Sequence, residues 1–129
     1  SLHNLNRFGK EAGYLDKALA EAYRALKPGG IAGVVQHRAP ETASAKWADG
    51  SNGYLKQSMV IAAFEAAGFK LVEASEINAN PKDRPSETDN VWRLPPSLRG
   101  AEENSAKWQE HKNIGESDRM TLKFVKPAK

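Results

Sequence analysis

The sequence contains no cysteine, and this absence excludes several kinds of chemistry at once. Without thiols the chain has no disulfide bond, no thiolate ligand for a metal and no cysteine nucleophile. A chain without cysteine suits a reducing compartment, and we therefore expect a cytoplasmic protein.

Long apolar runs are lacking as well. No stretch approaches the roughly 20 apolar residues of a membrane span, and no charged-then-apolar leader pattern is present. The three histidines are scattered without metal-site spacing, and the turn at Asp49 lacks the acidic ladder of a calcium loop. We expect neither a membrane partner nor a bound metal.

Blocks of charge of one sign are also absent. The 19 basic and 16 acidic residues are interspersed, and the net charge is +3. This balance is compatible with an anionic ligand but does not favour a nucleic-acid partner. The length of 129 residues corresponds to one domain, which we expect to span residues 1–129.

What the sequence does contain is an amphipathic segment, a glycine turn and a short apolar run. Apolar side chains recur every three or four positions between residues 10 and 27, which predicts a helix. Residues 31–36 are β-branched and uncharged, as is typical of a strand covered on both faces. Gly29 and Gly30 lie between them, after a helix instead of before one, so they predict a chain reversal and not a phosphate-binding loop.

A second unit of the same kind follows. Residues 54–67 are alanine-rich and end at Gly68, which predicts a helix, and residues 70–77 predict a strand. Strand, helix and strand in this spacing favour a right-handed crossover between two parallel strands. Residues 118–126 alternate between apolar and polar side chains, which predicts a half-buried closing strand.

Residues 78–117 form a long polar stretch that contains four of the seven prolines. A connection of this length without regular structure is uncommon in a compact domain. We interpret it as a long loop or lid, a partner-binding excursion or a partly disordered segment, with a helix possible over residues 101–112.

Polar side chains gather where the predicted strands end. Ligands of open α/β sheets bind at the carboxyl ends of parallel strands, and an antiparallel last strand would begin at the same rim. The candidate residues at this rim are His37, Arg38, Asn78, Asn80, Lys82, Glu116, Asp118 and Arg119.

Each candidate has a structural alternative. His37 could act as a general base or bond a neighbouring loop, because imidazole titrates near neutrality and also donates and accepts hydrogen bonds. Arg38 could clamp a carboxylate or phosphate, or pair with Asp118 or Glu116 to hold two loops together. The asparagines could grip a polar ligand or form turns.

Two further groups remain open in the same way. His3, Asn4 and Arg7 could line the same cleft or belong to a frayed terminus. The three tryptophans could stack on a ligand or pin the long loop to the body of the protein, and they are Trp47, Trp92 and Trp108.

The helix end at residues 25–30, with the strand after it, resembles the corresponding helix and fifth strand of class I S-adenosylmethionine-dependent methyltransferases. The resemblance, to a bacterial group of predicted methyltransferases, extends over nearly the whole chain. Its further segments are residues 53–54, 68–71, 76–83, 91–98 and 114–120.

This resemblance implies an α/β fold with a partial Rossmann-like sheet of about three strands, the last antiparallel between the other two, flanked by helices. It implies that the chain is the C-terminal, substrate-side half, with His3 and Asn4 beside the methyl-transfer centre and the segments at residues 37–38 and 78–82 on the substrate side. The cofactor would be S-adenosylmethionine. The family's glycine-rich loop and acidic cofactor residue have no counterpart here, so we expect the isolated chain to need a missing half for activity.

Three functions follow as hypotheses. The first is the substrate-side portion of a methyltransferase, acting on a methyl acceptor that the sequence does not identify. The second is a non-catalytic interaction module, a homodimer or subunit, that pairs through the open edge of the strand at residues 31–36. The third and weakest is a small nucleic-acid binder that uses the tryptophans and the slight positive charge.

Overall fold

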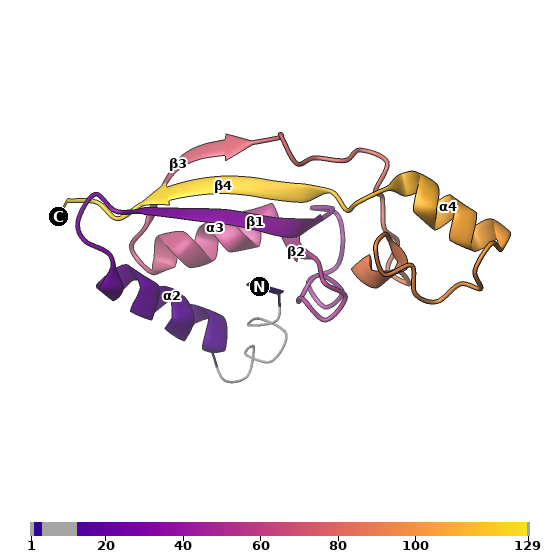
Figure 1. Ribbon diagram of the computed structural model, residues 1–129. Helices are drawn as coiled ribbons and strands as arrows, with labels where there is room; N and C mark the ends of the chain where they lie inside the picture. Colours follow the sequence, from indigo (N-terminus) through magenta and orange to yellow (C-terminus); the bar gives the residue numbers. More distant parts are fainter. Residues whose placement is uncertain (1, 4–12, 129) are drawn as a thin grey trace.

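The computed structural model describes residues 2–3 and 13–128, and its fold is α/β. A mixed four-stranded sheet carries two helices on one face (Figure 1). The elements in chain order are α2 (Tyr14–Ala25), β1 (Ile31–Ala39), β2 (Leu55–Lys56), α3 (Gln57–Ala66), β3 (Lys70–Ser75), the 3₁₀ helix η1 (Val91–Arg93), α4 (Ala106–Ile114) and β4 (Arg119–Val125). Among the described helices none has the length and apolar character to cross a membrane.

The strand order is β2-β1-β4-β3, and β4 is antiparallel to both of its long neighbours. The last strand of the chain therefore lies between β1 and β3, which makes those two parallel to each other. This arrangement confirms the predicted central position and direction of the closing strand.

The fourth strand, β2, was not predicted, and the prediction of a helix from residue 54 is wrong at its start. Leu55 and Lys56 pair in parallel with Ala39 and its neighbour at the end of β1, and α3 begins only at Gln57. Tyr54 and Leu55 are completely buried. Their burial and pairing hold this segment extended, although its composition also suits a helix.

The prediction that the first strand is covered on both faces is also wrong. Ile31 and Val35 are about half exposed, at 50% and 54%, whereas Val34 between them is buried. Side chains alternate along a strand, so the residues that share a face with Val35 lie away from α2 and α3. We call this face, with Ile31, Gly33, Val35 and His37 of β1, the outer face of the sheet.

The main core lies between the inner face of the sheet and the two helices. Leu15 and Leu19 of α2 are buried in it, as the helical periodicity predicts. Phe64 of α3 stacks on Phe124 of β4 with 4.2 Å between ring centroids and 9° between ring planes. Aromatic burial of this kind ties α3 to the central strand.

The long connection at residues 78–117 is described throughout and lies at one end of the sheet (Figure 1). It contains η1 and α4, the latter placed five residues further into the chain than the predicted helix start at residue 101. Ser105 caps α4 by accepting a hydrogen bond from the Trp108 amide. A second apolar cluster of Ala39, Trp47, Ala48, Tyr54 and Val91 packs the η1 part of this connection against the end of β1 and the segment between β1 and β2.

Candidate active site

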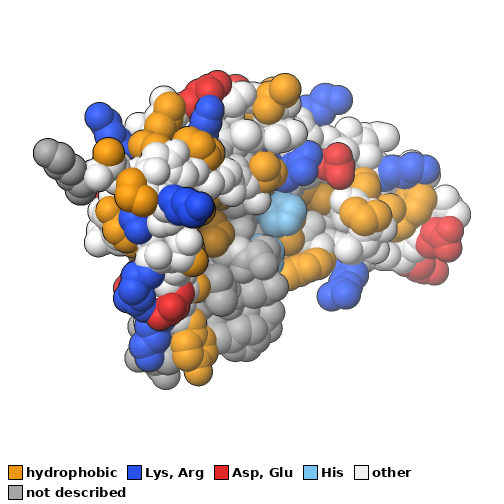
Figure 2. Space-filling view, turned by 60° about the vertical axis from the view of Figure 1, so that its left-hand side comes forward, with side chains coloured by type: hydrophobic (Ala, Val, Ile, Leu, Met, Phe, Trp, Pro, Cys, Tyr) orange, Lys and Arg blue, Asp and Glu red, His pale blue; other side chains and the backbone are white. Residues whose placement is uncertain are grey.

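A pocket opens where β1 ends and β4 begins, and its floor is a cross-strand pair on the outer face. His37 and Arg119 are directly opposite each other in the β1–β4 ladder. The pocket has a volume of about 220 Å³, and its lining includes His37, Trp92, Leu94, Pro95, Ser117 and Arg119. In Figure 2 a histidine side chain reaches the surface in a hollow among hydrophobic and charged side chains.

His37 is neutral near pH 7 in this environment. Its pKa is lowered from 6.5 to about 4, first by burial and then by electrostatic interactions with His3 and Arg119, with Asp83 and Glu116 acting in the opposite direction. Its Nδ1 lies 2.5 Å from the hydroxyl oxygen of Ser117, which is buried. Within the described residues, its Nε2 has no hydrogen-bond partner and is available to a ligand.

Arg119 presents an incompletely paired guanidinium to the pocket. Its Nε is buried and has no hydrogen-bond partner within the part of the chain that the structure describes. Its Nη2 lies 3.8 Å from Glu116 Oε2, and the Glu116 side chain is 73% exposed. The side chain as a whole lines the pocket and is 31% exposed, so its outer N–H groups can meet an acceptor there.

The opposite wall of the pocket is apolar and comes from the chain around η1. Trp92 lies there, with its ring edge toward the His3 ring at 6.3 Å between centroids. The amide of Val91 donates to the Asn52 carbonyl, and a Cβ on Gly53 would lie 2.2 Å from Val91 Cγ1. Gly53 has a φ of +88°, so both its conformation and its close contact with η1 require glycine.

Arg38 has a different position from its neighbour His37. The prediction that both residues follow the strand is wrong, because β1 continues to Ala39 and places the two side chains on opposite faces. Arg38 forms two bonds of 3.0 Å with the Asp118 carboxylate and also pairs with Glu76. These bonds raise its pKa. They match the alternative in which Arg38 holds two loops together, with Asp118 and not Glu116 as its partner.

Asn78 and Asn80 use their amides to hold the rim. Asn78 Nδ2 donates to Thr121 Oγ1 at 2.7 Å, and Asn80 Nδ2 donates to the Ile114 and Glu116 carbonyls at 2.8 and 2.7 Å. Asn80 Oδ1 accepts the backbone amide of Lys82, whose side chain is exposed. These contacts support the turn-forming interpretation of the asparagines.

His3 lies beside the pocket, and its ring centroid is 5.7 Å from that of His37. Its backbone amide donates to Gln36 Oε1 at 3.3 Å, which places the described residues 2–3 against β1. His3 is therefore near the pocket but is not among the residues that line it, so its place in the cleft stays a prediction. Asn4 and Arg7 lie outside the described residues.

The other two tryptophans lie elsewhere. Trp47 is buried, stacks on Tyr54 at 5.3 Å between centroids, and donates its indole N–H to the Asp89 carbonyl. It therefore pins the long loop, as one alternative predicted. Trp108 in α4 has the Lys112 ammonium 5.1 Å from its ring centroid.

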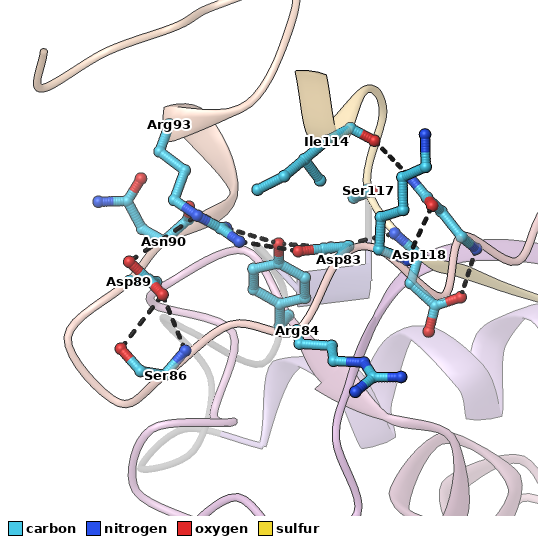
Figure 3. Close-up of polar contacts among 12 residues, drawn as sticks. Asp83, Arg84, Ser86, Asp89, Asn90, Arg93, Ile114, Ser117 and Asp118 are labelled. Carbon is cyan, nitrogen blue, oxygen red and sulfur yellow. Dashed lines mark hydrogen bonds and ion pairs between the residues drawn. The ribbon is translucent and has the colours of Figure 1, made fainter. Parts of the chain in front are cut away.

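Sequence reasoning missed a buried polar network that fixes the rim (Figure 3). The Tyr54 hydroxyl donates to Asp83 Oδ2 at 2.8 Å and accepts from Arg93 Nη1 at 3.0 Å. Burial, followed by the Asp83 charge, raises the pKa of Tyr54, so its hydroxyl stays protonated. The only sequence signal was an arginine within the apolar run Val91-Trp92-Arg93-Leu94.

Comparison of the sequence with protein-family models found no match, and comparison with curated proteins found none either. Among the described residues, no group of three or more histidine, aspartate or glutamate side chains could hold a metal ion.

Proposed function

We propose that this chain forms the acceptor-binding side of a class I S-adenosylmethionine-dependent methyltransferase and that the His37 pocket holds the methyl acceptor. The observation that carries the proposal is the pairing of a neutral imidazole with an incompletely bonded guanidinium in one pocket at the carboxyl end of β1. Open α/β sheets bind ligands at this rim.

The sheet supports the proposal in two ways. Its order β1-β4-β3, with the antiparallel strand in the middle, is the order that the family resemblance implies for the fifth to seventh strands. In addition, β1 pairs on its other side only with β2, through Arg38 and Ala39, among the described residues. Most of that edge is therefore in the position where a class I sheet continues.

The described residues do not fit the cofactor. A phosphate- or nucleoside-binding glycine turn joins a strand to the helix after it, but Gly29 and Gly30 join α2 to β1. β2 leads into α3 directly from Lys56 to Gln57, without a glycine. The proposed role of this chain is therefore confined to the acceptor.

Within that role, His37 would orient the acceptor. When Nδ1–H donates to Ser117 Oγ, Nε2 carries the lone pair and can accept a hydrogen bond from a hydroxyl or amine in the pocket. Arg119 would orient the acceptor, and Trp92 and Leu94 would exclude water. Positioning of this kind is a major part of catalysis when the chemistry needs only a ready nucleophile.

The test is to read the genomic DNA upstream of the Ser1 codon and to express the complete reading frame. We expect that frame to encode a strand followed by a glycine-rich turn, and its product to bind S-adenosylhomocysteine in calorimetry. The 129-residue chain serves as the matched control and should give no heat. A reading frame without such a segment, or a complete product that does not bind S-adenosylhomocysteine, would contradict the proposal.

A second candidate function is an interaction module that forms a homodimer. It is favoured by the exposed apolar side chains of β1 and β3 and the turn after β3, which are Ile31 (50%), Val35 (54%), Val72 (54%) and Ile77 (81%). Exposed apolar side chains on a sheet invite association. Light scattering at tens of micromolar tests this function, and a monomeric mass would count against it.

A further inference from the structure

We infer that the pocket of His37, Trp92, Ser117 and Arg119 takes a small aromatic carboxylate that also carries a hydroxyl group. This inference rests on the proposed function for the role of the ligand as methyl acceptor, but its binding chemistry comes from the pocket itself. The carboxylate would bind Arg119, and the hydroxyl would face His37.

The carboxylate of the ligand is inferred from the position and bonding of Arg119. Its Nε is buried without a hydrogen-bond partner in the described residues, and its contact with Glu116 is a long one of 3.8 Å. The Arg119 side chain lines the pocket and is 31% exposed, and a guanidinium offers parallel N–H groups that a carboxylate accepts. An ammonium ligand would instead meet a like charge.

The nearby acidic groups do not cancel this preference. Asp83 already accepts hydrogen bonds from the Tyr54 hydroxyl, Arg93 and the Asp118 amide. Glu116 is mostly in solvent, where water screens its charge. Arg119 therefore leaves the pocket with a positive side, in agreement with its part in lowering the pKa of His37.

The aromatic body follows from the size and walls of the pocket. Its volume is about 220 Å³. An apolar cavity of roughly 150 Å³ binds benzene, so one substituted ring fits here. Trp92, Leu94 and Pro95 provide flat or apolar surfaces on which a ring can pack.

The hydroxyl group of the ligand is inferred from His37, the other residue of the cross-strand pair. His37 and Arg119 face each other in the ladder, and side chains in such a pair have Cβ atoms about 5 Å apart. A single ring can therefore carry one substituent to each of them. Neutral His37 Nε2 has no competing partner in the described residues and can accept a hydrogen bond from the hydroxyl.

The test is an NMR titration of the 129-residue chain with salicylate near pH 7. We expect shifts at the Trp92 indole and at residues 116–119. Salicylamide has the same ring and hydroxyl but no negative charge, and we expect it to bind about tenfold more weakly, because the charged hydrogen bonds are lost. Benzoate, which lacks the hydroxyl, should also bind more weakly than salicylate.

Two variants locate the site. Arg119→Lys keeps the charge but loses the planar fork, and we expect salicylate to bind about tenfold more weakly. The matched control is Arg24→Lys on the exposed surface of α2, which should bind like the unchanged chain. His37→Gln should remove the preference for salicylate over benzoate.

Several results would overturn the inference: no salicylate shifts at about 10 mM, equal affinity for salicylamide, or shifts that avoid residues 116–119. The comparison of ligands needs no variant, so a variant that fails to fold leaves the inference testable. Because the titration contains no cofactor, failure here with S-adenosylhomocysteine binding intact would reject the substrate class and keep the methyltransferase. Salicylate binding without S-adenosylhomocysteine binding would support the ligand class of the pocket and reject the methyltransferase function.

Discussion

Arg93 and Asp83 form an ion pair with 2.8 Å between Nη2 and Oδ1, and both side chains are buried. Tyr54 bridges the two, and the amide of Asp118 donates at 3.0 Å to Asp83 Oδ2, the oxygen that also accepts the Tyr54 hydroxyl. The network therefore joins the chain before α3, the long connection and the start of β4. It fixes the rim beside the pocket, and the charge of Asp83 also acts on the pKa of His37.

Breaking this pair from one side should destabilise the protein strongly. Asp83→Ala leaves Arg93 buried without its close carboxylate partner, which costs about 3–5 kcal/mol in the free energy of unfolding. Urea denaturation measures the loss. Asp89→Asn is the control, since Asp89 lies 3.8 Å from Arg93 Nε and is partly exposed, and we expect a loss below about 1 kcal/mol. Equal losses in the two variants would contradict the role of burial.

His37 should make the protein less stable in mild acid. Its pKa is about 4 in the folded protein against an ordinary 6.5, so the unfolded chain binds more protons between these values. The stability therefore falls as the pH decreases from 6.5 to 4. Carboxylates titrate in the same window, so the readout is the difference between the unchanged chain and His37→Gln, which should lose less stability. Identical pH profiles would show that His37 is not buried as described.

Arg38 should contribute to stability and not to ligand binding. Arg38→Met leaves the Asp118 and Glu76 carboxylates without their cation, and we expect a loss of about 2 kcal/mol in urea denaturation. Glu76→Gln removes only the exposed ion pair between Arg38 and Glu76, and we expect it to lower the free energy of unfolding by less than about 1 kcal/mol. Salicylate affinity should be unchanged in both variants, and a large loss of affinity would place Arg38 in the site after all.

Two adjacent valines test whether the outer face is covered in solution. Val34 is buried against the helices and Val35 is 54% exposed. We expect Val34→Ala to cost about 2 kcal/mol and Val35→Ala less than about 0.5 kcal/mol. A large effect of Val35→Ala that grows with protein concentration would instead indicate that a second copy covers this face.

The sequence could predict those features that depend on local patterns. The period of α2 and the alternation of β4 were sufficient for both elements, and the rim argument brought His37, Glu116 and Arg119 together. It failed for Arg38, because a strand extended by three residues turns adjacent side chains to opposite faces. The strand β2 was missed because its two residues are extended only through their pairing with β1.

The pocket wall could not be predicted for a related reason. Trp92 and Leu94 reach the site because Arg93 between them is bound by Asp83 and Tyr54, which are distant in the sequence. No local pattern contains such a contact. The buried guanidinium Nε of Arg119 is likewise a property of the packed structure and not of the residue type.

The central place of β4 determines when the sheet can form during synthesis. Among the described strands, β1 and β3 have no ladder with each other and are joined through β4, which follows both of them in the sequence. A nascent chain that ends before Arg119 therefore exposes two unpaired strand edges, the hallmark of aggregation-prone intermediates. The ladders of β4 with β1 and β3 can form only once β4 has been synthesised, so folding of the sheet should be slow and should benefit from chaperones that shield the unpaired edges.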